Sequence, residues 1–292
     1  MSTIAVVTGG NKGVGFEICR QLADKAVTVV LTARDEKRGI DAVAKLNSSG
    51  VVFHQLDVTD PASIASFANF IDHRFGKLDI LVNNAGVSST IVDEESFWSL
   101  NLPSEVIDEK AKQVQKPVTQ TFEGIQKCLE TNYYGAKHVT QALLTLMLKS
   151  NSPRLVNISS KLGQLENVQD ESARKILGDV DGLSEELVDE VVKGYLKDAK
   201  DEELLAKKGW SSNVSGYTMS KAALNAYTRV LAKKYPSLCA NAVSPGFVAT
   251  DMTFFKGTFT TEEGARGPVR LALMPDGGPS GQYFWMMQDS MF

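Results

Sequence analysis

Short runs of β-branched and other apolar residues alternate with stretches of helical periodicity along most of the chain. The apolar runs lie at 4–8, 27–32, 51–56, 78–82, 154–158 and 239–243, and apolar residues recur with helical spacing at 16–23, 37–46 and 217–235. Strands that are apolar throughout are typical of a parallel sheet covered by helices on both faces. The pattern therefore predicts an α/β fold with a doubly wound parallel sheet.

Two segments interrupt this alternation. Residues 88–120 are rich in polar residues and predict a long excursion over the carboxyl edge of the sheet. Residues 165–210 hold 13 acidic against 7 basic residues, and they predict an acidic helical insert in which Ser184 caps a helix with an apolar stripe. Because such a stripe must be covered, we expect the insert to belong to a single domain that spans residues 1–292.

Composition and charge exclude several classes of protein. With 31 basic and 35 acidic residues and no basic stripe, the chain is not expected to bind nucleic acid. It enters its first strand within a few residues and has no run of about 18 apolar residues, so we expect neither a targeting signal nor a membrane partner. The cysteines and histidines lack metal-ligand spacing, which predicts no metal site and a reducing, cytoplasmic location. These residues are Cys19, Cys128, Cys239, His54, His73 and His138.

A glycine-rich turn follows the first strand and opens a helix. Its sequence is Thr8-Gly9-Gly10-Asn11-Lys12-Gly13-Val14-Gly15. At the carboxyl edge of a sheet, the free N–H groups of such a turn and the positive end of the helix bind a pyrophosphate. The spacing G-x-x-x-G-x-G differs from the commonest dinucleotide fingerprint, and glycine clusters also occur in ordinary tight turns. We interpret this one as a dinucleotide site on a Rossmann-like sheet.

The end of the second strand predicts which dinucleotide binds. An acidic residue there would hold the ribose 2′-hydroxyl of NAD, whereas a 2′-phosphate needs positive charge. The strand ends at Arg34, which can form a bidentate pair with a phosphate, and Lys12 lies in the glycine turn close to the same point. Asp35 could act as the NAD-type acid, but we expect it to cap the following helix. The predicted cofactor is therefore NADP(H).

Polar residues also follow the third and fourth strands. Asp57, with Val58 after it, is placed to accept a hydrogen bond from an adenine amino group, and Asn83-Asn84-Ala85-Gly86 ends the next strand. Asp and Asn favour the turns at strand ends even where no ligand binds. Each of these signals is weak on its own.

A tyrosine and a lysine, Tyr217 and Lys221, are four residues apart and therefore share one face of a helix. A neighbouring ammonium lowers the pKa of a phenol and makes it a proton donor and acceptor suited to neutral pH. Ser160 follows a strand and reaches the same sheet edge, where its hydroxyl could bind a substrate oxygen. Asn132 is expected in mid-helix, where asparagine is unfavourable unless its amide is used. The segment Pro245 to Asp251 follows the sixth strand and could bring backbone and a hydroxyl to a nicotinamide carboxamide.

Taken together, these motifs resemble the short-chain dehydrogenase/reductases. They are T-G-x-x-x-G-x-G, N-N-A-G, the mid-chain Asn, the Ser, Y-x-x-x-K and P-G, and they cover nearly the whole chain. The resemblance is closest to monomeric carbonyl reductases and to plant menthone/neomenthol and salutaridine reductases. It implies the catalytic set Asn132, Ser160, Tyr217 and Lys221. It implies cofactor contacts by Thr8, Gly9, Asn11, Lys12, Gly13, Val14, Gly15, Arg34, Asp57, Val58, Asn83, Ala85, Gly86, Tyr217, Lys221, Pro245, Gly246, Val248 and Thr250.

The resemblance implies hydride transfer from NADPH to a carbonyl carbon while Tyr217 protonates the oxygen, Ser160 holds it, and Asn132 supports a water chain. The expected substrate is a bulky, largely apolar ketone or aldehyde, terpenoid-like or alkaloid-like, with Leu165, Phe247 and Met252 in its pocket. The insert resembles one that covers the dimer face in monomeric members, so we expect a monomer. Two alternatives remain open: reduction of a conjugated C=C bond, and an NADPH-binding regulator without catalysis.

Overall fold

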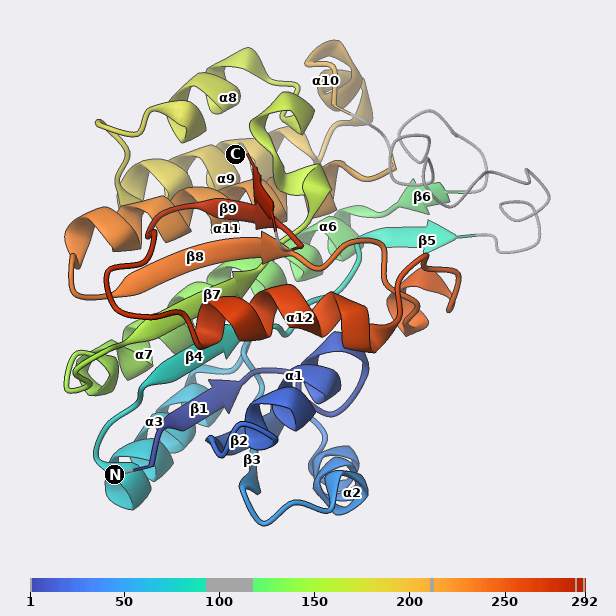
Figure 1. Ribbon diagram of the computed structural model, residues 1–292. Helices are drawn as coiled ribbons and strands as arrows, with labels where there is room; N and C mark the ends of the chain where they lie inside the picture. The colour runs from blue at the N-terminus through green and yellow to red at the C-terminus, as the bar shows by residue number, and fades with distance from the viewer. Residues whose placement is uncertain (1, 93–117, 211–212, 287, 291) are drawn as a thin grey trace.

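One mixed sheet lies at the centre of the molecule (Figure 1). The computed structural model describes residues 2–92, 118–210, 213–286, 288–290 and 292. The strands of the central sheet are β1 (Ile4–Val7), β2 (Thr28–Ala33), β3 (Val51–Gln55), β4 (Ile80–Asn83), β7 (Arg154–Ile158), β8 (Cys239–Ser244), β9 (Tyr283–Trp285) and β10 (Gln288–Ser290). Their spatial order is β3-β2-β1-β4-β7-β8-β9-β10, and every neighbouring pair is parallel except β9 with β10. The order reverses between β1 and β4, where open α/β sheets bind their ligands.

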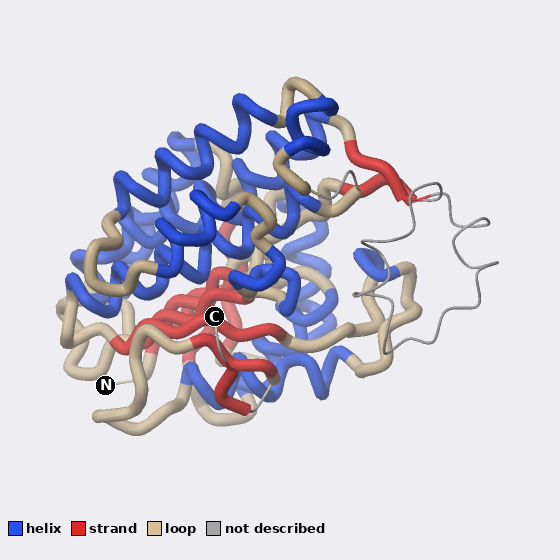
Figure 2. Tube along the Cα trace, turned by 90° about the horizontal axis from the view of Figure 1, so that it is seen from above, coloured by secondary structure: helices blue, strands red, loops and turns tan. Residues whose placement is uncertain are grey.

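Helices cover both faces of this sheet, as Figure 2 shows. One face is packed by α1 (Gly13–Ala23), α2 (Glu36–Leu46) and α12 (Thr261–Ala272). The other is packed by α3 (Pro61–Phe75), α6 (Phe122–Leu129), α7 (Ala136–Met147) and α11 (Ser215–Lys234). Every residue of β1, β4 and β7 is buried, which is why these strands carry apolar runs rather than alternating ones. The fold is the predicted Rossmann-like α/β sandwich.

Local signals in the sequence fix where several helices begin. Asp35 precedes α2, and its side chain accepts a hydrogen bond from the backbone N–H of Arg38. Asp60 caps α3 in the same way, with Pro61 at the first helical position, and Gly76 ends that helix in the left-handed conformation. These caps satisfy N–H groups that have no partner inside the helix.

The predicted insert is helical and packs on the layer of helices that covers one face of the central sheet. After a short 3-10 turn, η4 (Leu165–Asn167), it contains α8 (Glu171–Gly178), α9 (Glu185–Asp198) and α10 (Glu202–Lys207). The Ser184 side chain caps α9, as expected. Asp189 of α9 accepts hydrogen bonds from the Tyr133 hydroxyl and the Lys137 ammonium, both at 2.7 Å. Because Tyr133 lies just before α7 and Lys137 lies in its first turn, the bonds hold the insert against the body of the domain.

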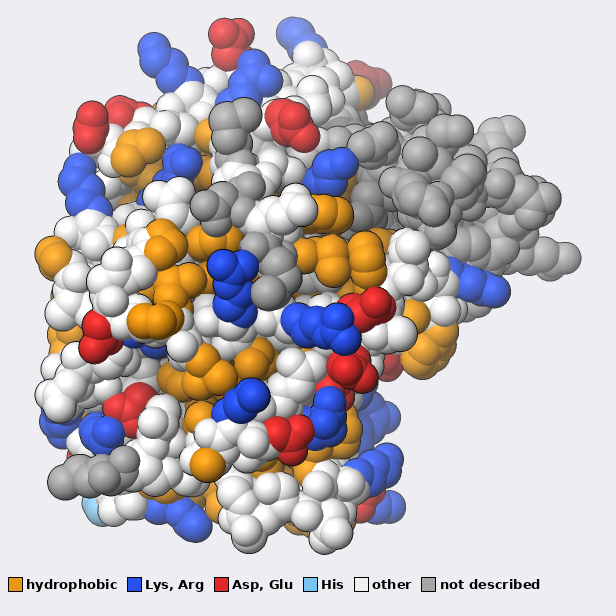
Figure 3. Space-filling model, viewed as in Figure 1, with side chains coloured by type: hydrophobic (Ala, Val, Ile, Leu, Met, Phe, Trp, Pro, Cys, Tyr) orange, Lys and Arg blue, Asp and Glu red, His pale blue; other side chains and the backbone are white. Residues whose placement is uncertain are grey.

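The predicted excursion at 88–120 is described only at its two ends. There β5 (Thr90–Val92) and β6 (Val118–Gln120) form a separate antiparallel pair, and the rest of that prediction lies outside the described residues. Two short strands, β9 and β10, were not predicted. Within the described part of the chain, no helix is long and apolar enough to span a membrane, and no three side chains form a metal-binding group. On the face shown in Figure 3, acidic and basic side chains are interspersed.

Candidate active site

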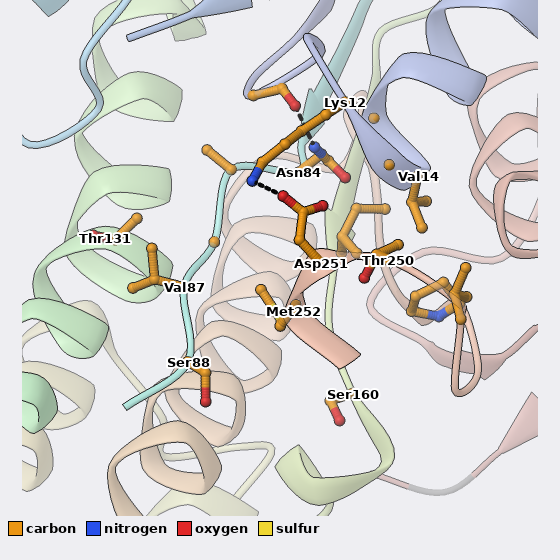
Figure 4. A pocket seen from close by; sticks show the side chains of 18 of the residues that line it. Lys12, Val14, Asn84, Val87, Ser88, Thr131, Ser160, Thr250, Asp251 and Met252 are labelled. Carbon is orange, nitrogen blue, oxygen red and sulfur yellow. Dashed lines mark hydrogen bonds and ion pairs between the residues drawn. The ribbon is translucent and has the colours of Figure 1, made fainter. Parts of the chain in front are cut away.

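A cavity of about 730 Å³ opens at the carboxyl edge of the sheet, above the ends of β1, β2, β4, β7 and β8. It has two chemically distinct ends. We call the region formed by the turn Gly9–Gly15 with Arg34 and Arg38 the glycine end. We call the region around Ser160, Tyr217 and Lys221 the tyrosine end. Residues of both ends line the same cavity, and Figure 4 labels Lys12 from the first and Ser160 from the second.

Backbone geometry forms the first wall of the glycine end. Gly9 and Gly13 have φ angles of +62° and +57°, which residues other than glycine rarely adopt. Helix α1 begins at Gly13, and no side chain caps its first N–H groups. A Cβ on Gly15 would lie 2.3 Å from the Asn84 side-chain nitrogen and 2.7 Å from the Gly9 carbonyl oxygen. Because no side chain fits at Gly15, the turn packs closely against the rest of the chain. The N-terminus of α1 then lies in the cavity wall, where its N–H groups can bind an anion.

Three cations surround the glycine end. Arg34 and Arg38 line the cavity, and both are exposed. Lys12 lies in the glycine turn and pairs with Asp251 across the cavity (Figure 4). This pairing lowers the pKa of the Asp251 carboxyl. Asp35, the acid beside Arg34, also lines the cavity, and its Oδ1 atom accepts a hydrogen bond of 2.8 Å from the Arg38 N–H as the cap of α2.

Asp57 lines the cavity beyond β3. Its Oδ1 atom accepts hydrogen bonds from the backbone N–H of Thr59 at 2.9 Å and from the Thr59 hydroxyl at 2.7 Å. This arrangement is the turn that aspartate favours at strand ends. The structure therefore shows the turn interaction and also places the residue in the cavity wall.

At the tyrosine end, Tyr217 and Lys221 lie one turn apart on α11. The Lys221 ammonium is 5.7 Å from the centre of the Tyr217 ring and donates a hydrogen bond of 2.7 Å to the carbonyl oxygen of Ile158. Lys221 is only 4% exposed, and burial lowers its pKa to about 8. Ser160, which follows β7, lines the same cavity, and its hydroxyl oxygen accepts from the N–H of Leu162 at 3.2 Å.

Asn132 lies behind this wall, in a π-helical turn η2 (Glu130–Gly135) between α6 and α7. Such turns occur often at functional sites. Its Oδ1 atom accepts from the Val87 N–H at 2.8 Å, and its amide nitrogen donates to the Val87 carbonyl at 3.0 Å and to the Ser220 hydroxyl at 3.0 Å. The side chain therefore fixes the backbone of Val87, which lines the cavity.

Comparisons with known proteins agree with this geometry. The model of the short chain dehydrogenase family matches residues 3–172. The chain belongs to this family. It is 52% identical to salutaridine reductase of Papaver bracteatum over 99% of this chain and 96% of that protein. It is 49% identical to (-)-isopiperitenone reductase of Mentha piperita over 96% of this chain and 95% of that protein.

A solved structure agrees as well. Salutaridine reductase from Papaver somniferum matches with a TM-score of 0.90 and 50% identity, and the match covers 97% of this chain and 99% of that one. The chain is therefore an oxidoreductase of the short-chain dehydrogenase family, with that family's fold.

Most of the site residues expected of a short-chain dehydrogenase lie together in the cavity wall. They are Gly9, Asn11, Lys12, Gly13, Val14, Gly15, Arg34, Asp57, Val58, Ala85, Gly86, Ser160, Tyr217, Lys221, Pro245, Gly246, Phe247, Val248, Thr250 and Met252. Several other lining residues were not predicted from the sequence, among them Arg38, Val87, Thr131, Leu162, Val214 and Phe254. Arg38 could have been found, because it is four residues beyond Arg34 and follows the Asp35 cap.

Four expected residues are not part of the wall. The Thr8 hydroxyl oxygen accepts from the N–H groups of Asn84 and Ala85, both at 2.9 Å, and so holds the turn after β4. Asn83 is buried and donates to the Asn157 side chain at 2.8 Å. Asn132 is buried behind the wall and hydrogen-bonds the backbone of Val87, which is part of the wall. Leu165 packs on the core near α8, where a Cβ on Gly178 would lie 3.1 Å from it.

Proposed function

We propose that this enzyme uses NADPH to reduce a ketone or aldehyde on a bulky, largely apolar small molecule to the alcohol. The observation that best supports this function is that the glycine end, with its cations, and the tyrosine end, with its buried lysine beside Tyr217 and Ser160, belong to one cavity. The similarity to salutaridine reductase supports a terpenoid-like or alkaloid-like substrate.

The residues of the glycine end fit a phosphorylated dinucleotide. The uncapped start of α1 offers N–H groups to a pyrophosphate. Three cations, Lys12, Arg34 and Arg38, offer a 2′-phosphate charge and hydrogen bonds. The carboxylate that would bind a free ribose hydroxyl, Asp35, is used in a helix cap. This donor set favours NADP(H) over NAD(H).

At the tyrosine end, the chain's own groups handle the proton. When bound, the reduced nicotinamide supplies a hydride to the carbonyl carbon. The Tyr217 hydroxyl donates its proton to the carbonyl oxygen, on which negative charge develops, and the Ser160 hydroxyl donates a hydrogen bond to the same oxygen. The Lys221 ammonium stabilises the phenolate that Tyr217 leaves behind. Asn132 fixes the nearby wall through Val87 and supports the water chain that returns a proton from solvent.

The apolar side chains around this end support the substrate class. Val87, Leu162, Val214, Phe247, Met252 and Phe254 all line the cavity. Apolar lining with a few fixed polar groups is typical of sites for small apolar ligands. An apolar ring system can lie against these side chains while its carbonyl oxygen reaches Tyr217 and Ser160.

The test is turnover of the purified enzyme with a panel of cyclic ketones, measured once with NADPH and once with NADH. We expect NADPH oxidation with stoichiometric formation of the alcohol, and a much lower kcat/KM with NADH. Tight NADPH binding without turnover on any ketone or enone would instead identify a nucleotide-binding regulator.

Reduction of a conjugated C=C bond is the second candidate, because one relative is named for an enone, isopiperitenone. The product formed from a cyclic enone separates the two reactions. Carbonyl reduction gives the allylic alcohol, and alkene reduction gives the saturated ketone. Chromatography against both standards should show the allylic alcohol, because in the proposed mechanism Tyr217 donates its proton to the carbonyl oxygen.

We also propose that the enzyme is a monomer, because the helical insert covers the surface formed by α7 and α11. Helix α9 packs against α11 and is tied to α7 by the bonds of Asp189, so this surface is occupied within the chain. Sedimentation at micromolar concentration should give a single species of 31.7 kDa. A stable dimer would contradict the proposal. The three cysteines, Cys19, Cys128 and Cys239, are free thiols, which suits a reducing cytoplasm.

A further inference from the structure

One ion pair crosses the cavity at the glycine end. Lys12 belongs to the turn before α1, and Asp251 is the first residue of a short 3-10 turn, η5 (Asp251–Thr253), beyond β8. Their side chains meet over the cavity, which both residues line (Figure 4). The two residues are 239 positions apart in the chain, so this contact ties one wall of the cavity to the other.

The pair is easily opened. The side chains of Lys12 and Asp251 are 59% and 49% exposed. Ion pairs with this exposure contribute little to stability, because water screens both charges. A second anion with more charge and more acceptor oxygens, such as a phosphate monoester, can therefore replace the carboxylate.

The other two cations at this end are not committed in this way. Among the described residues, neither Arg34 nor Arg38 makes an ion pair within 4.0 Å, although both line the cavity. A 2′-phosphate that binds at the glycine end thus meets two available guanidinium groups and one ammonium that already holds a carboxylate.

We propose that Asp251 competes with the 2′-phosphate of the cofactor for the Lys12 ammonium, and so sets how strongly the enzyme prefers the phosphorylated cofactor. The inference rests on the proposed NADPH dependence. Binding of NADPH transfers the Lys12 contact from Asp251 to the phosphate. A cofactor without the 2′-phosphate leaves the pair in place. Asp251 therefore lowers the affinity for NADPH and leaves the affinity for NADH unchanged.

The first test is a titration of the intact enzyme with NADPH and with NADH, followed by the fluorescence of the bound cofactor. Asp251→Asn should lower the Kd for NADPH by about 2- to 5-fold, the range that corresponds to an exposed ion pair, with the Kd for NADH unchanged. Equal tightening of both cofactors, or no tightening of either, would overturn the proposal.

The control for Asp251→Asn is an exposed Asp–Lys ion pair that lies outside the cavity. Asp72 of α3 pairs with Lys149 at 3.3 Å, and the two side chains are 55% and 50% exposed. Asp72 does not line the cavity. Asp72→Asn removes the same charge at a distance, so both Kd values should match those of the unmodified enzyme. A gain in NADPH affinity equal to that of Asp251→Asn would show that only net charge matters and would reject the competition.

A second variant distinguishes competition for Lys12 from direct repulsion between Asp251 and the phosphate. In the Lys12→Met background, Asp251→Asn should bring no further gain in NADPH affinity. A gain that persists there would reject the competition. If the unmodified enzyme binds NADH as tightly as NADPH, the proposed cofactor is wrong and the inference falls with it. If it prefers NADPH but Asp251→Asn changes nothing, the inference alone is wrong.

Discussion

The glycine end of the cavity is made of backbone and exposed cations, whereas the tyrosine end is made of a buried lysine and two partly buried hydroxyl side chains, Ser160 and Tyr217. At the glycine end, the turn Gly9–Gly15 and the exposed Arg34 and Arg38 all come from the first 38 residues. At the tyrosine end, Ser160 follows β7 while Tyr217 and Lys221 lie on α11, and Lys221 is 4% exposed. In the proposed mechanism, cofactor binding depends on solvated charge and free N–H groups, whereas proton transfer depends on a desolvated lysine. If so, variants at one end should change cofactor affinity and variants at the other should change turnover.

The largest separation is expected for Tyr217→Phe. Loss of a positioned general acid typically costs 10²- to 10⁴-fold, so kcat should fall by about that factor while the Kd for NADPH stays within about 2-fold. Steady-state kinetics and cofactor titration measure the two quantities. Tyr235→Phe is the control: it removes a hydroxyl at the end of the same helix, outside the cavity, and should retain normal turnover. A Tyr217→Phe enzyme with normal kcat would refute the assigned proton donor.

The reverse effect is expected at the glycine end. Arg34→Ala should raise the Kd for NADPH by about 10- to 100-fold, because a charge-assisted contact to phosphate is lost, and it should leave NADH binding unchanged. At saturating NADPH, kcat should remain near that of the unmodified enzyme. Arg266→Ala, an exposed arginine on α12 outside the cavity, serves as the control. Equal weakening for NADH and NADPH would mean that Arg34 does not bind the 2′-phosphate.

Burial of Lys221 predicts a pH dependence of stability. Its pKa is lowered to about 8, whereas an unfolded lysine titrates near 10.4, so between these values the unfolded chain holds a proton that the folded chain has lost. Relative to Lys221→Met, the free energy of unfolding of the cofactor-free enzyme should rise by about 2 kcal/mol from pH 7 to pH 9.5. Urea unfolding at the two pH values measures this difference.

The comparison with Lys221→Met is needed because the buried Cys128 thiol has a raised pKa, about 11, and works in the opposite direction. The charged lysine is lost over the same range, so kcat should fall as the pH rises above about 8. A flat difference between the two proteins across this range would show that Lys221 is solvated in solution.

The last prediction compares the effects of alanine substitutions at two glycines on the stability of the protein. Gly15→Ala places a Cβ 2.7 Å from the Gly9 carbonyl oxygen and should destabilise the protein by about 1–3 kcal/mol while weakening cofactor binding. Gly194→Ala, in α9, meets nothing within 4 Å and should stabilise it by about 0.5–1 kcal/mol. Thermal unfolding of both variants checks the signs. A destabilising Gly194→Ala would mean that α9 is packed more tightly than described.

The two ends also differ in how well the sequence predicted them. The glycine end comes from contiguous signals: an apolar strand, a glycine turn and a helix start. Lys12, Arg34 and the glycines at 9, 13 and 15 therefore line the cavity, as predicted, whereas Arg38 was not predicted. The tyrosine end combines residues from two segments. The shared helix face of Tyr217 and Lys221 is a weak signal on its own, and the catalytic set was predicted from the resemblance to the short-chain dehydrogenases. Periodicity alone could not show that Asn132 lies in a π-helical turn and contacts Val87 rather than the cavity.

Two of the predicted site residues that lie outside the cavity wall do so for a common physical reason. Thr8 and Asn83 belong to motifs at strand ends, but buried polar groups need partners, and theirs are other parts of the protein: Asn84 and Ala85 for Thr8, Asn157 for Asn83. A motif shows that a residue type is required, without showing whether a ligand or the backbone requires it. The strands β9 and β10 were missed because three residues are too few to show an alternation of polar and apolar positions.

The most direct test of the account is a structure of the enzyme with NADP and a ketone that cannot react with the oxidised cofactor. The quantity to measure is the distance from the Tyr217 hydroxyl oxygen to the ketone oxygen. We expect about 2.6–3.2 Å, with the Ser160 hydroxyl oxygen at a similar distance and the carbonyl carbon facing the nicotinamide. A ketone oxygen held by other groups, beyond hydrogen-bonding range of both hydroxyls, would contradict it.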